Sequence, residues 1–395
     1  MDILDKISQK FVDLHHSEPL IFKSPGRINI IGEHTDYNAG KVLPAAIDKN
    51  IYMAVGFRDD DEINLYAADY SDQCVAHLHE LKPAWKLWPN YSLGVINEIA
   101  KRGFELRGLN IVFGGDIPLA VGLSSSAAIT CATVFALNYL FSFNLPRLDM
   151  AKIAQAAEHN FVGVHCGLMD QFASLYGKTG NLIRLDCKTN DYQYIPFQPK
   201  DFKLILFDTG IKHHLVSSAY NERRQECETG LGLVMQHQPE VEDMSQVTEN
   251  MLYNHVKPVN ETVFKRCLYV IQENRRLEDA CLAIQDGDFE LLGKRMFETH
   301  EGLKTLYEVS CIECDFLVDL CHKSPYVLGA RVQGGGFGGC IINLIKNEQA
   351  EEVSELVKAG YKARFGKDLK VYNVFPSNGT RLIKTNNEEM LAAML

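Results

Sequence analysis

Runs of basic residues are absent from this sequence. The 395 residues include 40 Lys and Arg against 51 Asp and Glu, which gives a formal net charge of −11. Neighbouring basic residues occur only as pairs beside acids, such as Arg223-Arg224 and Arg275-Arg276. Nucleic-acid binding needs a basic stripe, and an acidic surface disfavours anionic membranes. We therefore expect no nucleic-acid partner and no membrane partner.

The chain also lacks an apolar leader and a disulfide framework. Its first residues, Met1–Phe11, read as the start of an amphipathic helix with early acids, and no secretory signal is expected. The eleven cysteines are scattered, and an odd number cannot pair completely within one chain. Free thiols in a reducing compartment are the simplest account, so we predict a cytoplasmic location.

Charge is missing from one long segment, Ile117–Pro146. A stretch of this length raises the possibility of a transmembrane helix. Against this, no Lys or Arg cluster flanks either end. Polar residues also interrupt the helical part: Thr130, Thr133, Asn138 and Ser142. We favour a core helix that packs on more than one side.

Strand-like and helix-like segments alternate irregularly, without a serial βαβ rhythm, which favours an α+β fold. The length suffices for two domains with sizeable cores. A buried strand opens the second half, so we predict an N-terminal domain over 1–195 and a C-terminal domain over 196–395. The expected strands are Ile51–Phe57, Leu109–Phe113, Asn181–Leu185, Lys203–Asp208, Cys340–Ile345 and Leu369–Val374. The expected helices are Tyr91–Lys101, Ser126–Phe141, Arg147–Val162, Ala219–Met235, Glu261–Asp286, Phe289–Lys304, Cys314–His322 and Glu351–Phe365.

A glycine- and serine-rich stretch, Gly114–Ala128, opens onto the uncharged segment. Gly122 allows a tight turn, and three serines then bring hydroxyls and backbone N–H groups to a helix start. A helix N-terminus with free N–H donors binds anions, so the stretch is typical of a phosphate site. The usual P-loop is absent, because no Gly-Lys-Ser/Thr follows. We predict nucleotide chemistry on a different loop.

A second stretch, Ser24–Gly40, places Glu33 and Asp36 on either side of His34. Carboxylates and an imidazole within four residues suit the hydroxyls of a polyol or sugar. A metal site is the rival interpretation, although the spacing matches no standard ion-binding loop. A plain surface loop is the third.

A third stretch, Gly329–Cys340, formally satisfies the dinucleotide pattern G-x-G-x-x-G. A strand rather than a helix is expected after it, which argues against dinucleotide binding. Five glycines in six residues still indicate unusual backbone conformations or close contacts. The stretch is either a second wall around phosphates or a structural turn.

Two acids and a cysteine pair stand outside these stretches. Asp170 lies in an apolar neighbourhood, where an acid is unusual unless it is paired or catalytic. Glu158, if it faces Ser126, offers Mg²⁺ a carboxylate beside a hydroxyl. Cys311-Ile-Glu-Cys314, with Cys321 and His322, is a possible zinc set. We favour core or half-buried thiols, because a helix over residues 308–320 would turn the adjacent Cys and His to different faces.

Together and in this order, the three stretches resemble the GHMP kinases, the superfamily of galacto-, homoserine, mevalonate and phosphomevalonate kinases. The segment Gly26–Gly40 resembles the signature of the galactokinase family within it. The resemblance implies a two-domain α+β fold with the active site in the interdomain cleft. It also implies ATP-dependent phosphorylation of the anomeric hydroxyl of galactose, with Mg²⁺. ATP and a small sugar are then the expected partners.

The resemblance assigns roles residue by residue. Asp170 corresponds to the proposed base and Arg27 to its partner. The implied sugar-binding residues are Glu33, His34, Thr35, Asp36 and Tyr220. The implied nucleotide-binding residues are Trp88, Ala120, Val121, Gly122, Leu123, Ser124, Ser125 and Ser126. The implied metal ligands are Ser126 and Glu158.

The sequence departs from the family pattern at two places. Ala120-Val121 stands where galactokinases usually have Gly-Ala, and Val332-Gln333 replaces a more usual Met-Thr before the glycines. Neither change removes a group with an implied catalytic role. Two alternatives stay open: the same chemistry on N-acetylgalactosamine, galacturonate or arabinose, and a sugar-sensing regulator without turnover.

Overall fold

The computed structural model describes residues 2–118, 121–211 and 216–384. Its first half is built on a six-stranded sheet of order β13-β1-β3-β6-β4-β5. The strands are β1 (Leu20–Asn29), β3 (Pro44–Phe57), β4 (Glu62–Ala67), β5 (Asp72–His77), β6 (Leu109–Gly115) and β13 (Arg381–Lys384).

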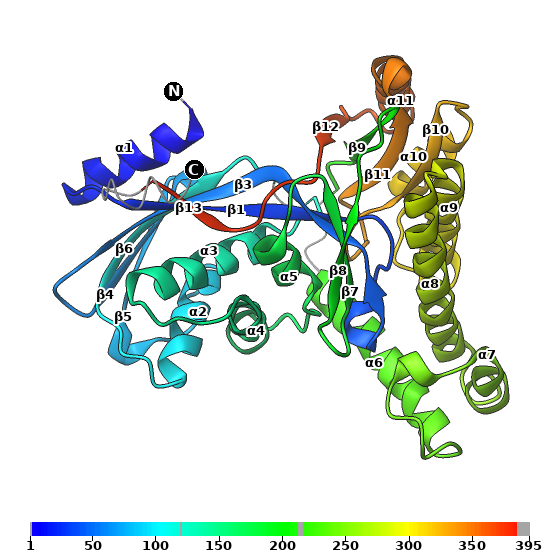
Figure 1. The fold of residues 1–395 in the computed structure, drawn as a ribbon, viewed down its shortest axis with the longest axis horizontal. Helices are drawn as coiled ribbons and strands as arrows, with labels where there is room; N and C mark the ends of the chain where they lie inside the picture. The colour runs from blue at the N-terminus through cyan, green and yellow to red at the C-terminus, as the bar shows by residue number, and fades with distance from the viewer. Residues whose placement is uncertain (1, 119–120, 212–215, 385–395) are drawn as a thin grey trace.

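Helices cover both faces of this sheet (Figure 1). One face carries α1 (Ile3–His15), whose Ile7 and Phe11 are buried against β1, β3 and β6. The other face carries α2 (Pro89–Lys101), α3 (Ser125–Leu140), α4 (Arg147–Ala157) and α5 (Met169–Tyr176). Residues alternate along β3, so that Ala54 faces α1 while Met53 and Val55 face the main core.

The uncharged segment forms a core helix, as predicted. Helix α3 packs against α2, α4 and α5 and against strands β1 and β3. Contacts on several sides explain why its sequence shows no polar face. Among the described residues, no helix is long and apolar enough to cross a membrane.

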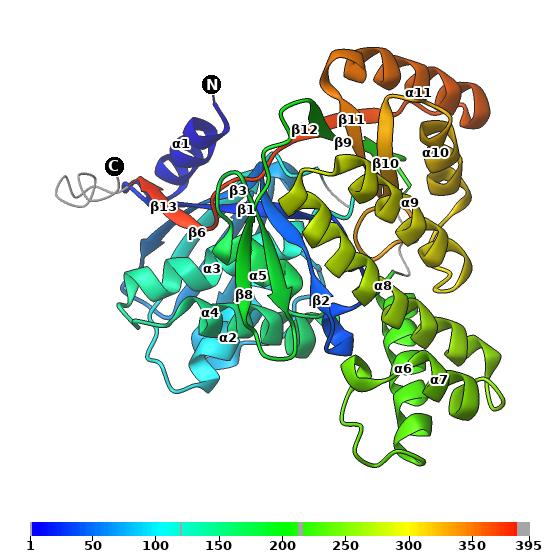
Figure 2. The ribbon, with the colours of Figure 1, turned by 45° about the vertical axis from the view of Figure 1, so that its right-hand side comes forward.

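The second half contains a four-stranded sheet of order β10-β11-β9-β12. Its strands are β9 (Phe202–Asp208), β10 (Val327–Val332), β11 (Cys340–Lys346) and β12 (Lys370–Val374). The larger helices of this half are α6 (Val216–Met235), α8 (Glu261–Asp286), α9 (Phe289–Thr305), α10 (Ile312–His322) and α11 (Ala350–Phe365). Figure 2 shows α6 and the short α7 (Glu249–Met251) projecting away from both sheets. The architecture is the α+β fold that the sequence predicts.

A small sheet of β2 (Lys41–Val42), β7 (Asn181–Asp186) and β8 (Tyr192–Pro196) lies where the two halves join. The predicted boundary between residues 195 and 196 falls at the end of β8 and stays a prediction. The last described strand, β13, returns to the first sheet and pairs with β1 in antiparallel register, with Phe22 opposite Leu382.

Two expected helices differ from the structure. The helix expected over residues 308–320 begins only at Ile312, because Glu308 has a left-handed backbone (φ +55°) and the Val309 carbonyl accepts a hydrogen bond from Phe337 N–H. The helix expected over Arg147–Val162 changes at Glu158 into a π-helical turn that ends before Gly163. The acidic segment between Pro239 and Pro258 contains short helical turns.

Candidate active site

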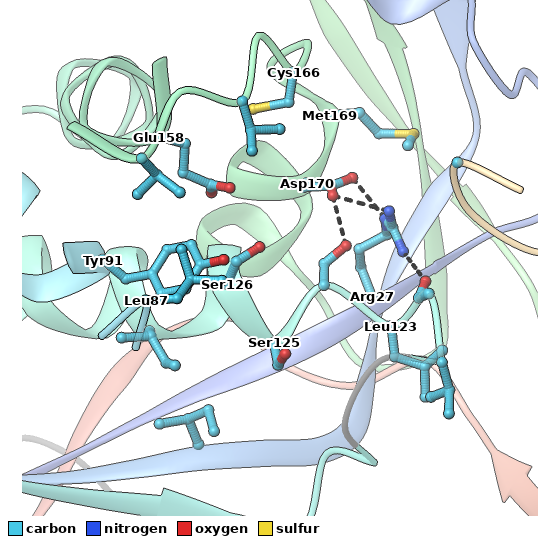
Figure 3. Close-up of a pocket in the computed structure, with 18 of the residues that line it drawn as sticks. Arg27, Leu87, Tyr91, Leu123, Ser125, Ser126, Glu158, Cys166, Met169 and Asp170 are labelled. Carbon is cyan, nitrogen blue, oxygen red and sulfur yellow. Dashed lines mark hydrogen bonds and ion pairs between the residues drawn. The ribbon is translucent and has the colours of Figure 1, made fainter. Parts of the chain in front are cut away.

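A cavity of about 790 Å³ lies between the two halves of the chain. All three stretches that the sequence analysis selected contribute to its lining, and Figure 3 shows part of it. The predicted site residues that line it are Arg27, Glu33, His34, Asp36, Trp88, Val121, Gly122, Leu123, Ser124, Ser125, Ser126, Glu158, Asp170 and Tyr220. Thr35 does not line it, and Ala120 lies outside the described residues.

Arg27 and Asp170 form a bidentate ion pair at the centre of the cavity (Figure 3). Arg27 Nε lies 2.7 Å from Asp170 Oδ1, and Nη2 lies 2.9 Å from Oδ2. Arg27 Nη1 also donates to the Gly122 carbonyl at 2.5 Å. Burial opposes the charge of Arg27, but Asp170, Glu33 and Asp36 together outweigh it and raise the pKa of the guanidinium. The pair therefore fixes the Asp170 carboxylate, which is still 23% exposed, toward the cavity.

Ser124 has a different contact from the one the sequence suggested. Its backbone is left-handed (φ +56°), and its hydroxyl donates to Asp170 Oδ2 at 2.6 Å instead of capping helix α3. The side chain therefore orients the carboxylate of Asp170, the candidate base. Only the backbone of Ser124 stays available to bind a phosphate in the predicted phosphate loop, Val121–Ser126. Nothing in a single sequence separates this serine from its two neighbours.

The phosphate loop is shaped by a close approach between the two halves. Gly122 has a φ of +80°, and a Cβ there would lie 2.8 Å from the Gln333 carbonyl oxygen. Only glycine fits both the conformation and the space. The third stretch, Gly329–Cys340, which we call the glycine-rich stretch, therefore packs directly behind the loop, and its Gly335 lines the cavity.

Glu158 and Ser126 face each other across the cavity wall (Figure 3). The π-helical turn places Glu158, which is 4% exposed, where its Oε1 accepts a hydrogen bond from Gln171 Nε2 at 2.7 Å. Burial raises the pKa of Glu158 to about 7, and the Asp170 carboxylate adds to this. A buried carboxylate that is costly to ionise is a suitable ligand for a cation.

The second stretch, Ser24–Gly40, is held in place by a buried arginine that the sequence analysis did not identify. Arg331, on β10, donates from Nη2 to Glu33 Oε1 at 3.0 Å and from Nε to the Ile30 carbonyl at 2.8 Å. Gly334 N–H donates to the same Glu33 oxygen at 2.9 Å. Burial opposes ionisation, but Arg331 and Arg27 lower the pKa of Glu33 below its ordinary value. Glu33 is thus an ionised carboxylate at the cavity edge.

His34 and Asp36 follow with altered proton affinities. Burial lowers the pKa of His34 to about 4, so the imidazole is neutral at physiological pH. Its Nδ1 lies 2.7 Å from the Tyr37 hydroxyl, and its buried Nε2 has no hydrogen-bond partner among the described residues. Burial raises the pKa of Asp36 to about 7, and the carboxylates of Asp170 and Glu33 contribute. Both side chains offer hydrogen-bonding atoms to a polar ligand.

The remaining predicted residues differ in how they meet the cavity. Trp88 is half-buried, and its Nε1 donates to Asp72 Oδ2 at 3.0 Å. Tyr220 lies beside His34, with ring centroids 5.4 Å apart. Thr35 is buried, and its hydroxyl lies 2.8 Å from the Gly32 carbonyl and 2.6 Å from that of Lys41. The structure therefore places Thr35 behind the stretch, where it supports the loop.

Three family models match this chain. "GHMP kinases N terminal domain" matches residues 90–178, and "GHMP kinases C terminal" matches residues 278–363. "Galactokinase galactose-binding signature" matches residues 9–57, which contain Glu33, His34 and Asp36.

Curated relatives match over nearly the whole chain. Galactokinase of Thermotoga maritima is 40% identical over 363 residues, which cover 91% of this chain and 99% of that protein. The chain belongs to the galactokinase family. Galactokinase of Clostridium acetobutylicum is 37% identical over 390 residues, which cover 97% of this chain and 100% of that protein. As a member of this kinase family, the chain is an ATP-using enzyme.

Solved structures show the same fold. A crystal structure of Lactococcus lactis galactokinase complexed with galactose matches with a TM-score of 0.92 and 32% identity, covering 97% of this chain and 100% of that one. Mevalonate kinase of Methanococcus jannaschii matches with a TM-score of 0.63 and 20% identity, covering 92% and 99%. The second likeness concerns the fold alone.

The possible zinc set is not assembled in this galactokinase-family chain. Cys321 is buried in the apolar core of the second half, and the His322 ring packs against Phe297. Among the described residues, one group of three metal-ligand side chains lies close together, and it is elsewhere, on the surface: Asp61, His77 and His79.

Replacing Glu158 with Gln should stabilise the ligand-free protein at pH 8 by a few degrees in Tm. The pKa of Glu158 is about 7 in the folded protein against an ordinary value of 4.5, so the folded state binds a proton that the unfolded state has lost. Stability therefore falls as pH rises between these values, and Gln removes that cost. The gain should disappear near pH 5. Thermal melts of both proteins from pH 5 to 8, without Mg²⁺ or ATP, measure it.

Glu105→Gln is the matched control, because Glu105 is exposed in the loop between α2 and β6. It should show no pH-dependent gain. Equal melting temperatures for Glu158→Gln and the wild type at pH 8 would contradict the raised pKa of Glu158.

Proposed function

We propose that this chain transfers the γ-phosphoryl group of ATP to the anomeric hydroxyl of galactose. The observation that carries the proposal is the Arg27–Asp170 pair. In one cavity, this pair lies beside both the second stretch, Ser24–Gly40, which contains Arg27, and the phosphate loop. A reacting centre for phosphoryl transfer needs both substrates at one carboxylate, because positioning and charge stabilisation dominate this chemistry.

Asp170 would orient the sugar hydroxyl and accept its proton. Donors from Arg27 and Ser124 fix both carboxylate oxygens, which leaves the remaining lone pairs facing the cavity. Arg27 would also stabilise the negative charge that develops on the transferring group. We assign sugar hydroxyl contacts to Glu33, His34, Asp36 and Tyr220, with Thr35 as a supporting residue.

The nucleotide would occupy the other end of the cavity. The segment Val121–Ser126 would bind its phosphates through backbone N–H groups at the start of α3, and Trp88 would contact the adenine. Ser126 and Glu158 fit a Mg²⁺ ion, because Mg²⁺ prefers few protein oxygen ligands together with phosphate oxygens. When bound, the ion would neutralise charge on the phosphates. We also propose a cytoplasmic location, which the eleven unpaired thiols support.

The test is ADP release by the purified protein with ATP and Mg²⁺ across a panel of galactose, glucose, N-acetylgalactosamine, galacturonate and arabinose. We expect the highest kcat/KM with galactose. Turnover that is highest with another sugar would keep the chemistry and overturn the substrate. Binding of galactose by calorimetry without turnover on any sugar would contradict the proposed reaction and favour a sugar-sensing regulator.

A further inference from the structure

Cys311 and Cys314 lie at the start of α10, beside the glycine-rich stretch. Cys311 is the N-cap residue and is half-buried, whereas Cys314 is buried in the first turn. Residues three apart at a helix start lie on one side, so the two thiols are neighbours on the same side of α10. The pair therefore combines one partly exposed cysteine with one buried cysteine.

Cys314 also contacts the glycine-rich stretch, because its Sγ lies 3.8 Å from the Gly338 carbonyl oxygen. Phe337 N–H donates to the Val309 carbonyl at 2.6 Å, so the segment before α10 and the glycine-rich stretch are joined at neighbouring points. Gly335 of the same stretch lines the cavity, where a Cβ would lie 3.3 Å from the Tyr220 ring. Cys314 is therefore linked to the proposed sugar site through two contacts of the glycine-rich stretch, one at Gly338 and one between Gly335 and Tyr220.

The stretch also contacts the phosphate loop. Cys340, which ends the stretch, donates from Sγ to the Val121 carbonyl at 2.9 Å. Gly339 carries a backbone φ of +76° and lies against the backbone of Val121. Displacement of the stretch would thus alter both substrate ends of the cavity.

We propose that Cys311 and Cys314 are a modification site. Small disulfides such as oxidised glutathione convert this dithiol reversibly into a Cys311–Cys314 disulfide, and the oxidised protein has lower phosphoryl-transfer activity. The effect on turnover rests on the proposed function, whereas formation of the disulfide does not. The two thiols are suited to unequal roles. The neighbouring Cys314 thiol lowers the pKa of Cys311, whereas Cys311 and burial raise the pKa of Cys314.

The reaction is a two-step thiol–disulfide exchange. The Cys311 thiolate attacks one sulfur of the small disulfide, which breaks its S–S bond and releases one small thiol. Cys314 then loses its proton, and its sulfur attacks Cys311 Sγ in the mixed disulfide, which releases the second small thiol. Two protein thiols are oxidised by two electrons, and one small disulfide is reduced to two thiols.

The disulfide removes the hydrogen of the Cys314 thiol and draws its sulfur toward Cys311, away from Gly338. Because neighbouring contacts position both substrates, we expect kcat to fall at least about fivefold in the oxidised protein. Full activity should return on reduction with dithiothreitol.

The experiment incubates the purified chain with oxidised glutathione, follows the Cys311–Cys314 disulfide by peptide mass spectrometry and measures ADP release in parallel. Cys311→Ser should keep the activity of the reduced protein and lose the response to oxidation. Cys74→Ser, which removes another half-buried thiol on β5, should respond as the wild type does. This control separates the pair from general thiol oxidation.

Three results would overturn the proposal. The disulfide between residues 311 and 314 fails to form, it forms without change in kcat, or Cys311→Ser loses activity as the wild type does. The first result leaves the proposed kinase function untouched, because the reduced protein is assayed separately. Absence of activity in the reduced protein would instead contradict the proposed function, while the mass spectrum would still test the disulfide.

Discussion

Replacing Asp170 with Asn should lower kcat by about 10²-fold or more, while galactose binding survives. The amide has the shape of the carboxylate but cannot accept the sugar proton. Its NH₂ group also opposes the donors of Arg27 or Ser124, which both point at the carboxylate. Steady-state ADP release and galactose titration by calorimetry measure the two effects separately.

Ser124→Ala is the matched control, because it removes one of the donors to Asp170 and keeps the carboxylate. We expect a smaller loss of kcat, about tenfold, which corresponds to the lower end of the range for one hydrogen bond to a charged group. Near-normal turnover in Asp170→Asn would refute the base assignment. Lost galactose binding would place Asp170 among the sugar ligands instead.

Replacing Arg331 with Met should lower the free energy of unfolding by about 3–5 kcal/mol. Arg331 is fully buried, and its guanidinium donates to Glu33 and to the carbonyls of Asn29, Ile30 and Val332. Met fills a similar volume but leaves the Glu33 carboxylate, which is 2% exposed, with its partner removed. Urea unfolding followed by circular dichroism measures the change.

The double variant Arg331→Met with Glu33→Gln should recover part of this stability, because a neutral amide is less costly to bury than an unpaired carboxylate. A loss below about 1 kcal/mol in the single variant would show that water reaches Glu33 once the arginine is gone. The double variant should not recover sugar binding, since Glu33 lies on the cavity wall.

The sequence predicted the bounds of helices that have capping residues at their ends. Helix α8 has the predicted bounds, Glu261–Asp286, because the Asn260 side chain caps its start and Gly287 ends it with a left-handed φ of +75°. The tight turn at Gly122 was likewise predictable, because a left-handed backbone conformation just before a helix favours glycine. The three chemical stretches were visible for the same reason, since each concentrates its residue types within a short segment.

Contacts between distant segments could not be predicted in this way. Arg331 lies 298 positions from Glu33 in the chain, so nothing near either residue indicates their ion pair. The contact of Ser124 with Asp170 depends on a left-handed backbone at a serine, which is an uncommon conformation. The π-helical turn at Glu158 inserts one residue per turn, and no propensity signals it.

The pairing of β13 with β1 has a consequence for synthesis on the ribosome. Strand β1 lacks its second neighbour until residues 381–384 have been made, so its edge stays open while the residues between the two strands are synthesised. The segment just before β13 also binds α5: Thr380 N–H donates to the Ser174 carbonyl, and Gly379 N–H donates to that of Gly177. The helix that carries Asp170 therefore reaches its final support only once residues 379–384 have been made, and a nascent chain that is shorter than this should lack the complete site.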